Sequence, residues 1–503
     1  TVPAPRRARR PSASRASKID LEFANEFGGF VDQAREYAIA IEGDQRPPAP
    51  WINVVANPSF GFHVAADGAS YTWSVNSRDN QITPWSNDPV VNRSGETLYI
   101  RDDESGELWG PTAHPWQNQA GSYRAFHGRG YSRFEHAAAE IASELTSFIP
   151  LDDSLKIMRL KLRNLSARPR RLSVAAYMEW VLATSRAQSA ASIVTEMSPG
   201  GTLMARNPRN QAYPHRLAFL GLRRGEATWT GDRSEFLGRH GSTADPAALV
   251  AGGALSNRIG AGLDPCGALL TQVALAPGEE REVTIFLGDA VAVGDADALI
   301  EKYRSANLDA VLAAVKSHWD DVLGAVTVAT PDRSMDLMLN GWLLYQTLAC
   351  RMWARSGFYQ ASGAFGFRDQ LQDCLALVFA APNLAREHIL RAAARQFVEG
   401  DLQHWWLPAS GQGVRTRIAD DPVWLAYAVA EYVSATGDAT ILDETVPYLE
   451  GPRLAEHEHD AFFAPEVRGK TASVNQHCVE ALQQRAAIGE RGLPLMRGGH
   501  WND

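Results

Sequence analysis

Short runs of alternating apolar and polar residues dominate the chain between Trp51 and Gly288. This two-residue period predicts β-strands with one buried face, and turn signals rich in Gly, Pro, Asn and Asp separate the runs. The predicted strands comprise residues 51–57, 61–68, 70–76, 96–102, 143–150, 156–164, 170–182, 215–222 and 280–288. So many short strands predict a large antiparallel sandwich, in which residues 161–180 form a hairpin.

The pattern differs on either side of this region. The residues before Trp51 predict a short helix followed by a strand at 36–41. From Asp295 the apolar period lengthens to about 3.6 residues, which predicts two linker helices with a break at Asn307. After Pro331 the helical period continues over residues 335–357, 369–381, 385–400, 421–437 and 475–490. Paired helices whose functional loops gather at one end are typical of an α/α toroid.

Composition and charge narrow the class of protein. Of 503 residues, 45% are apolar and 21% charged, as in ordinary soluble proteins of about two to four domains. The net charge of −9 argues against nucleic acid or an anionic membrane as the main partner. Fourteen Trp residues favour a protein that handles sugars, because indole faces stack on pyranose rings. The four Cys are scattered, which predicts reduced and mostly buried thiols in a cytosolic setting.

One stretch, from Phe358 to Asp373, combines aromatic rings, small residues and an Arg–Asp pair directly before an apolar helix. Its Gly and Ser residues let the backbone approach a ligand closely. Arg368 and Asp369 stand at the mouth of the predicted helix, and Asp369 and Asp373 share one helix face. A guanidinium, carboxylates and rings on one wall suit a sugar, whose hydroxyls need bidentate partners. The alternative is an ordinary helix N-terminus with an acidic first turn.

A second stretch, predicted as a loop, carries Trp405 and Trp406 and then Arg415 and Arg417. Two adjacent Trp residues on a loop are difficult to bury together, so we expect at least one to face a groove. Arg415 is a candidate for substrate binding. The alternative is that both Arg residues pair with the two Asp residues at 420 and 421.

A third stretch, at the end of the chain, contains Trp501 and Asp503. An acid beside an aromatic ring in a Gly-rich loop suits a general acid whose pKa is raised by apolar cover. GxSxG, Walker, HExxH and Rossmann glycine patterns are absent from the sequence. His457 and His459 alternate with acids, which favours a solvated surface over a metal site. We therefore expect no metal and no cofactor.

These motifs resemble family 94 of the glycoside hydrolases, the inverting glycoside phosphorylases. The resemblance rests on FYQASGAFGFRDQLQD, on QHWW followed by GVRTRIADDPVWL, and on GLPLM followed by WND. The N-terminal half, including PWINVVANPSFGFHVAADG and YSRFEHAAAEIASELTSFIPLDD, is similar to the phosphorylase-like region of cyclic β-1,2-glucan synthases and to β-1,2-oligoglucan phosphorylases. The similarity covers residues 20–503.

The resemblance implies a multidomain α and β fold with an N-terminal antiparallel β-super-sandwich, a helical linker and a partial (α/α)6 barrel. On this basis we expect a disordered basic tail over residues 1–19 and a carbohydrate-binding-type sandwich over 20–290. The helical linker would then occupy 291–330, and the N-terminal part of the catalytic barrel 331–503.

The resemblance also implies a mechanism and a set of site residues. Phosphate would attack the anomeric carbon of a β-glucan while Asp503, the general acid, protonates the departing oxygen, which yields α-glucose 1-phosphate with inversion. Phosphate is already an anionic nucleophile, so it needs no second carboxylate of the kind that activates water in inverting hydrolases. The resemblance places Arg368, Asp369 and Trp501 at the sugar subsite. The residue patterns described above add Asp373, Trp405, Trp406 and Arg415 to the expected substrate-binding residues.

The sequence departs from the family pattern in places. His500 replaces an Asp that usually precedes WND, and residues 473–478 read SVNQHC where SLYEHC is more usual. The family also continues well beyond Asp503, and its phosphate-binding groups lie in that continuation. We therefore expect a fragment with an incomplete barrel, which by itself binds sugar weakly and catalyses nothing.

The expected partners are a β-glucan oligosaccharide and phosphate, with no nucleic acid and no membrane contact in this segment. We expect a cytoplasmic homodimer, or the cytoplasmic domain of a membrane-bound synthase chain. The alternative functions are an inverting β-glucan hydrolase and a non-catalytic glucan-binding fragment.

Overall fold

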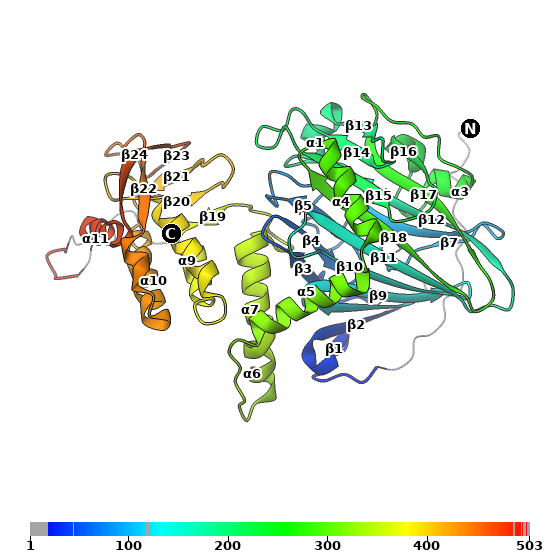
Figure 1. The fold of residues 1–503 in the computed structure, drawn as a ribbon, viewed down its shortest axis with the longest axis horizontal. Coiled ribbons are helices and arrows are strands. Elements are labelled where there is room, and N and C mark those ends of the chain that lie inside the picture. Colours follow the sequence, from blue (N-terminus) through cyan, green and yellow to red (C-terminus); the bar gives the residue numbers. More distant parts are fainter. Residues whose placement is uncertain are drawn as a thin grey trace. The chain divides into compact units, whose positions relative to one another are not determined.

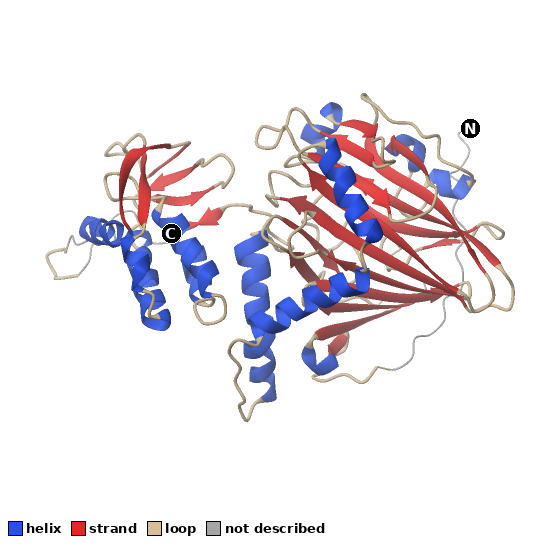
Figure 2. Ribbon diagram, in the orientation of Figure 1, coloured by secondary structure: helices blue, strands red, loops and turns tan. Residues whose placement is uncertain are grey.

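The computed structural model describes residues 19–43, 45–116, 121–485, 488–493, 495 and 499, and it divides the chain into two compact units (Figure 1). Unit 1 comprises Thr1–Trp319 and Ser356–Ala361, and unit 2 comprises Asp320–Arg355 and Ser362–Asp503. The predicted mixed fold is confirmed, because unit 1 is built from antiparallel sheets and unit 2 mainly from helices (Figure 2). The predicted basic tail lies outside the described residues, except for its last position.

Unit 1 contains three sheets. In spatial order, the largest consists of β1 (Gly28–Val31), β2 (Glu36–Glu42), β8 (Ser122–Gly128), β9 (Tyr131–Ala138), β10 (Ile141–Phe148), β11 (Leu155–Asn164), β18 (Glu280–Ala290), β15 (Leu217–Leu222), β14 (Leu203–Arg206) and β13 (Val194–Met197). The second consists of β16 (Thr228–Asp232), β17 (Pro265–Leu275), β12 (Arg170–Glu179), β6 (Glu96–Asp102) and β7 (Leu108–Trp109). The third consists of β3 (Ile52–Ala56), β4 (Phe60–Ala65) and β5 (Ser70–Ser74). Short helical turns connect them: η1 (Asp32–Ala34), α1 (Arg186–Ser189), η2 (Ala190–Ser192), α2 (Arg233–Phe236) and α3 (Ala247–Ala251).

One apolar core joins these sheets, because alternate residues of each strand face inward. Leu160 of β11, Val174 of β12 and Leu220 of β15 all belong to it and are at most 2% exposed. Burying a side chain of this size stabilises the fold by about 1.5–3 kcal/mol relative to leaving it exposed. The period-two pattern of the sequence thus marks the residues that hold the sandwich together.

The predicted hairpin at residues 161–180 is wrong. β11 pairs with β10 and β18 in the largest sheet, whereas β12 pairs with β6 and β17 in the second sheet. Both strands have an apolar inward face, and placing them in different sheets buries both faces in the core between those sheets. The segment that joins them therefore crosses from one sheet to the other.

The short helix predicted before the strand at 36–41 is limited to the three-residue turn η1, Asp32–Ala34. Gly28–Val31 forms β1, which pairs with β2, and β2 agrees with the strand predicted at 36–41. Two consecutive Gly residues have low helix propensity, and pairing with a neighbouring strand satisfies their backbone groups.

Two helices connect the sandwich to unit 2, as predicted. They are α4 (Val293–Ser305) and α5 (Leu308–Leu323), with the break at the predicted place. α4 packs on the largest sheet, where the Tyr303 ring lies 6.5 Å from that of Phe286 in β18. Near the end of α5, Trp319 packs closely against Gly130.

Unit 2 is mainly helical, as predicted, and two small sheets were not predicted. Its helical elements are α6 (Arg333–Leu337), the π-helical turns η3 (Met338–Trp342) and η4 (Thr347–Ala354), α7 (Leu343–Gln346), α8 (Phe367–Leu375), α9 (Pro382–Ala393), α10 (Asp421–Thr436), η5 (Ala439–Asp443) and α11 (Val474–Arg485). One sheet contains β19 (Phe365–Gly366), β20 (Gln403–Trp406), β21 (Gly413–Thr416) and β23 (Asp460–Phe463), and the other contains β22 (Thr445–Glu450) and β24 (Glu466–Ser473). The stretch from 403 to 416, predicted as a loop, is therefore a β-hairpin. Across the described ranges, no helix combines the length and apolar character needed to cross a bilayer.

Candidate functional site

The Arg368–Asp369 pair lies in the first turn of α8, as the sequence predicts. Gly366 of β19 directly precedes the helix, and its N–H donates to the side chain of Gln370 over 2.5 Å. Phe367 is buried in the core of unit 2, while Arg368 is half-buried and Asp369 is exposed. The positive end of the helix dipole favours a carboxylate at this position.

Asp373 lies one turn further along α8, where it forms an internal ion pair. Its Oδ2 accepts a hydrogen bond from Arg351 Nε over 2.9 Å. Burial raises the pKa of Asp373, and the positive charge of Arg351 opposes that shift. A direct role of Asp373 in substrate binding stays a prediction, since Arg351 already occupies one of its oxygens.

The N-terminus of α10 adds two carboxylates to those of α8. Arg368 Nη1 donates to Asp420 Oδ2 over 2.5 Å, and its guanidinium lies 4.9 Å from the centroid of the Trp424 ring. Asp421 is buried, and its Oδ2 is 2.6 Å from His404 Nδ1 of β20. Three elements, α8, α10 and β20, therefore bring charged and aromatic groups together.

The electrostatics of this cluster centre on Asp421. Burial raises the pKa of Asp421, His404 opposes the shift through its hydrogen bond, and the nearby charges of Asp420 and Asp369 raise the pKa further. Asp421 thus retains a proton to higher pH than an exposed carboxyl would.

Two carboxylate oxygens in the cluster lack donors within the described part of the chain. They are Asp420 Oδ1 and Asp421 Oδ1, and both atoms are buried. Buried acceptors of this kind are normally paired, because an unpaired one costs free energy. The hydroxyl groups of a sugar would supply donors, while Arg368 and the Trp424 ring would supply a charged donor and an apolar face.

The adjacent Trp residues occupy opposite faces of β20, as successive strand residues must. Trp405 is half-buried, and its ring centroid lies 5.5 Å from that of Phe462, which is 53% exposed. Trp406 is fully buried and packs on Phe365 at 5.6 Å. Trp405 is therefore the ring that lies nearer the surface, whereas Trp406 belongs to the core. Substrate binding by either residue stays a prediction.

Arg415 is buried, and its donors are occupied inside unit 2. Its Nε and Nη2 bind Asp401 over 2.7 and 2.6 Å, Nη2 binds Glu399 over 2.9 Å, and Nη1 donates to the Pro452 carbonyl over 2.8 Å. The alternative that it pairs with Asp420 or Asp421 is wrong. Arg417 instead donates to backbone carbonyls. Arg415 borders a hollow of about 550 Å³, and its role in substrate binding stays a prediction.

Trp501 and Asp503, together with His500, lie outside the described residues, so their proposed roles stay predictions. Conversely, the sequence did not assign His404 or Trp424 to the site. The two Asp residues before Pro422 could have indicated a helix start, because an Asp followed by Pro at the first helical position is an N-terminal signal.

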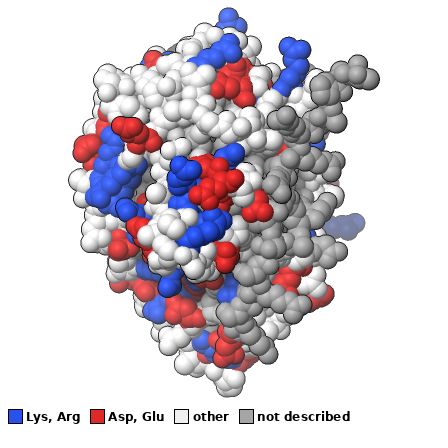
Figure 3. Space-filling view, turned by 90° about the vertical axis from the view of Figure 1, so that its right-hand side faces the viewer, with Lys and Arg blue, Asp and Glu red and all other residues white. Residues whose placement is uncertain are grey.

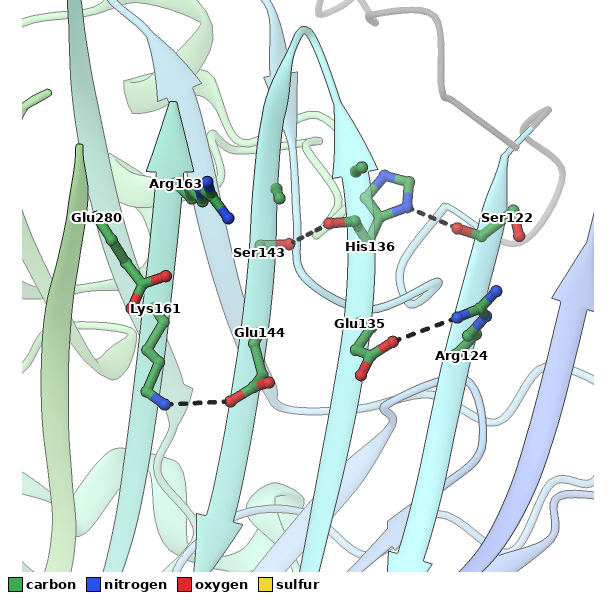
Figure 4. A pocket seen from close by; sticks show the side chains of 11 residues that line it. Ser122, Arg124, Glu135, His136, Ser143, Glu144, Lys161, Arg163 and Glu280 are labelled. Atoms are coloured by element: carbon green, nitrogen blue, oxygen red, sulfur yellow. Dashed lines mark hydrogen bonds and ion pairs between the residues drawn. The ribbon is translucent and has the colours of Figure 1, made fainter. Parts of the chain in front are cut away.

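Unit 1 has a hollow of its own, of about 360 Å³, on the outward face of its largest sheet (Figure 4). The charged side chains there form ion pairs with one another. Lys161 Nζ lies 3.5 Å from Glu144 Oε1, and Arg124 Nη1 lies 3.5 Å from Glu135 Oε2. Acidic and basic side chains are also mixed on the face seen in Figure 3. We therefore place the candidate site in unit 2, where two buried carboxylate oxygens have no donor among the described residues.

Both parts of the chain are similar to known proteins. Residues 35–306 match the model of the glycosyl hydrolase 94 supersandwich domain, and residues 318–503 match that of the glycosyl hydrolase 94 superfamily catalytic domain. Over 96% of its length the chain is 47% identical to a cyclic β-(1,2)-glucan synthase, NdvB of Rhizobium meliloti, and it covers 17% of that protein. It is 30% identical to the solabiose phosphorylase of Paenibacillus borealis and 27% identical to the N,N′-diacetylchitobiose phosphorylase of Vibrio furnissii, over 95% of this chain in each case.

The chain spans about three fifths of the length of those two phosphorylases, with 59% and 61% covered. A solved structure described as that of a kojibiose phosphorylase from the human microbiome shares the fold, with a TM-score of 0.52 at 7% identity over 81% of this chain and 57% of that one.

Proposed function

The chain belongs to the glycosyl hydrolase 94 family, and from this premise we propose that it acts in β-glucan metabolism as an inverting glycoside phosphorylase. Its substrate would be a β-1,2-linked glucan, and its products α-glucose 1-phosphate and a glucan shortened by one residue. The likeness to a cyclic β-(1,2)-glucan synthase over nearly the whole chain supports this linkage.

The proposed reaction is a single displacement. An oxygen of inorganic phosphate forms a bond to the anomeric carbon while the bond from that carbon to the glycosidic oxygen breaks. Asp503 gives its proton to the departing oxygen, and Trp501 borders the sugar. Inversion follows because the nucleophile attacks the face opposite to the leaving group.

One observation carries the proposal for the sugar subsite. Arg368, Asp420 and Asp421 meet where α8 and α10 begin, and two buried carboxylate oxygens there have no donor among the described residues. Asp369 lies in the same first turn. Such a set binds a neutral polyol through many hydrogen bonds and does not need a metal or a cofactor.

The deciding experiment incubates the full-length protein with β-1,2-linked glucose oligomers, with and without phosphate. We expect α-glucose 1-phosphate to form only with phosphate. Free glucose released at the same rate without phosphate would identify an inverting hydrolase instead. Calorimetric binding of the oligomers without turnover would identify a glucan-binding protein.

Two pairs of variants test the proposed residues. Asp503→Asn should abolish turnover while oligomer binding persists, and Asp443→Asn, at an exposed acid in η5, should leave turnover unchanged. Arg368→Lys should weaken oligomer binding by about tenfold, because a charge-assisted hydrogen bond contributes roughly this factor. Arg386→Lys is the matched control, since Arg386 is similarly half-buried and pairs with Asp438 and Glu444. Unchanged turnover in Asp503→Asn would refute the general-acid assignment.

A further inference from the structure

The stretch from Phe358 to Asp373 is divided between the two units. Ser356–Ala361 belongs to unit 1, although the residues on both sides of it, Arg355 and Ser362, belong to unit 2. We refer to Ser356–Ala361 as the excursion. It immediately precedes the segment that leads through β19 to Arg368 and Asp369 at the start of α8.

Two side chains of the sandwich hold the excursion by hydrogen bonds. The hydroxyl of Tyr71 in β5 lies 2.7 Å from Ser356 Oγ, and the indole Nε1 of Trp85 donates to the Phe358 carbonyl over 2.8 Å. The Phe358 ring also stacks on that of His63 in β4, with 6.1 Å between centroids, and Phe358 is only 6% exposed. The ring and the carbonyl of Phe358 are thus both held by side chains of the sandwich.

The excursion also has a defined internal shape. The Gly357 N–H donates to the Gln360 carbonyl over 2.8 Å, and Ser356 forms an antiparallel bridge with Ala361. Arg355, just before it, has a left-handed φ of 48°, which a residue with a side chain rarely adopts. Backbone conformations of this kind persist when the surroundings impose them.

Hydrogen bonds within unit 2 impose that conformation on Arg355. Its carbonyl accepts from the N–H groups of Ser362 and Gly363, both over 3.2 Å. Its Nε donates to the Gly363 carbonyl over 3.0 Å. Arg355, directly before the excursion, is therefore held within unit 2, whereas the excursion itself is held within unit 1.

From this arrangement we propose that Tyr71 and Trp85 are positioning residues for the sugar subsite, although both belong to the sandwich. By fixing Ser356–Ala361, they restrict the segment that continues to Arg368 and Asp369. That Tyr71 and Trp85 affect sugar binding rests on the proposed function. Their effect on the mobility of the segment can be measured without substrate.

The experiment compares Tyr71→Phe and Trp85→Phe with two matched controls from unit 1. The controls are Tyr99→Phe, where Tyr99 donates to the Thr243 carbonyl over 2.8 Å, and Trp116→Phe, where Trp116 donates to the Ala244 carbonyl over 2.9 Å. Each control removes one hydrogen bond made by the same type of side chain, here to a backbone carbonyl, without touching the excursion. Hydrogen exchange detected by mass spectrometry, without sugar, follows peptides that cover residues 356–361 and 363–370.

In both test variants we expect exchange to be about fivefold to tenfold faster in the two peptides, since one hydrogen bond contributes roughly this factor. The controls should leave both peptides at the wild-type rate. The affinity for β-1,2-linked glucose oligomers should fall severalfold in the test variants alone, and the pH profile of kcat should stay unchanged. The proposal would be overturned if exchange became faster only in residues 356–361 or did not change at all. An equal effect of the control variants would overturn it too. So would an unaltered glucan affinity of the test variants, provided that the wild-type protein binds glucan. If the wild-type protein binds no glucan, the proposed function fails. The exchange rate of residues 363–370 then still decides whether Tyr71 and Trp85 order the segment that leads to Arg368 and Asp369.

Discussion

Acidification should destabilise the sandwich as the pH falls below 6.5, because buried neutral histidines support it. Burial lowers the pKa of His63 to about 3, and it lowers those of His127 and His136 to about 4. Burial also lowers the pKa of His114. The contribution of such a histidine to the free energy of unfolding is fully present above 6.5, the pKa of an unfolded histidine. That contribution is lost as the pH falls from 6.5 toward the folded-state value.

The contacts of His127 explain why it resists protonation. Its Nε2 lies 3.2 Å from the Trp51 carbonyl, which can only accept, so this nitrogen carries the proton of the neutral ring. Its Nδ1 lies 3.0 Å from Ser132 Oγ, which already accepts a hydrogen bond from Asn53 Nδ2. The Ser132 hydroxyl therefore donates to Nδ1, and a second proton on the ring would break that bond.

The size of the effect follows from the shifts. At pH 5.5 the unfolded histidine is about 90% protonated while the buried one is neutral, which costs about 1.4 kcal/mol for each side chain. His63, His127 and His136 together should then lower the free energy of unfolding by about 4 kcal/mol between pH 8 and 5.5. That is a large part of the roughly 5–15 kcal/mol that stabilises a typical domain.

The assay equilibrates the protein in urea at pH 8 and at pH 5.5. A short pulse of hydrogen exchange at one common pH then labels the unfolded fraction, which is measured in peptides from β8 to β10. His127→Gln should reduce the difference between the two pH values by about 1.4 kcal/mol, because Gln does not titrate. His215→Gln, at an exposed position, should not change it. A wild-type difference below about 1 kcal/mol, or an undiminished one in His127→Gln, would refute the reasoning.

Three further predictions concern buried charges and rings. Lys156 and Glu96 form a buried ion pair at 2.6 Å, so Lys156→Met should cost about 3–5 kcal/mol in urea unfolding, and adding Glu96→Gln should restore most of it. Because the pKa of Asp421 is raised, its ionised form destabilises the fold as pH rises through that pKa. Asp421→Asn should therefore raise the Tm at pH 7 but not below pH about 4, while calorimetry shows weaker glucan binding. Trp406→Ala should cost about 3–5 kcal/mol of stability, whereas Trp405→Ala should mainly weaken glucan binding.

Much of the fold could be predicted because the period of the apolar residues matches the helix or strand that each segment forms. The alternating runs in unit 1 became strands, and the linker helices break where Asn307 interrupts the apolar pattern. Alternation does not specify which strands pair, however, since an inward apolar face fits either sheet of a sandwich. The crossing between β11 and β12 was missed for this reason. The four-stranded sheet of unit 2 was missed because its strands have only two to four residues.

The site was predicted in part. The position of Arg368 and Asp369 at a helix start was predicted correctly, because a charged pair there is visible in the sequence. Their role in sugar binding stays a prediction. The partnership of Arg368 with Asp420 joins residues from different helices, and only the packing of α8 against α10 brings them together. Arg415 was a candidate for substrate binding because it follows the two Trp residues in the second stretch, and that role stays a prediction. Its burial among Glu399 and Asp401 depends on contacts that no local pattern encodes.

The excursion has a consequence for how the two units can be separated. A boundary drawn where the apolar period changes assigns everything after the linker helices to the helical unit, including Phe358. The structure assigns Ser356–Ala361 to the sandwich, where Tyr71 and Trp85 bind it. A protein that begins after α5 would therefore expose the Phe358 ring and leave one end of the proposed sugar wall without its hydrogen-bond partners. Loss of glucan binding in such a truncated protein would follow from the missing sandwich, even with every residue of the Arg368 cluster present.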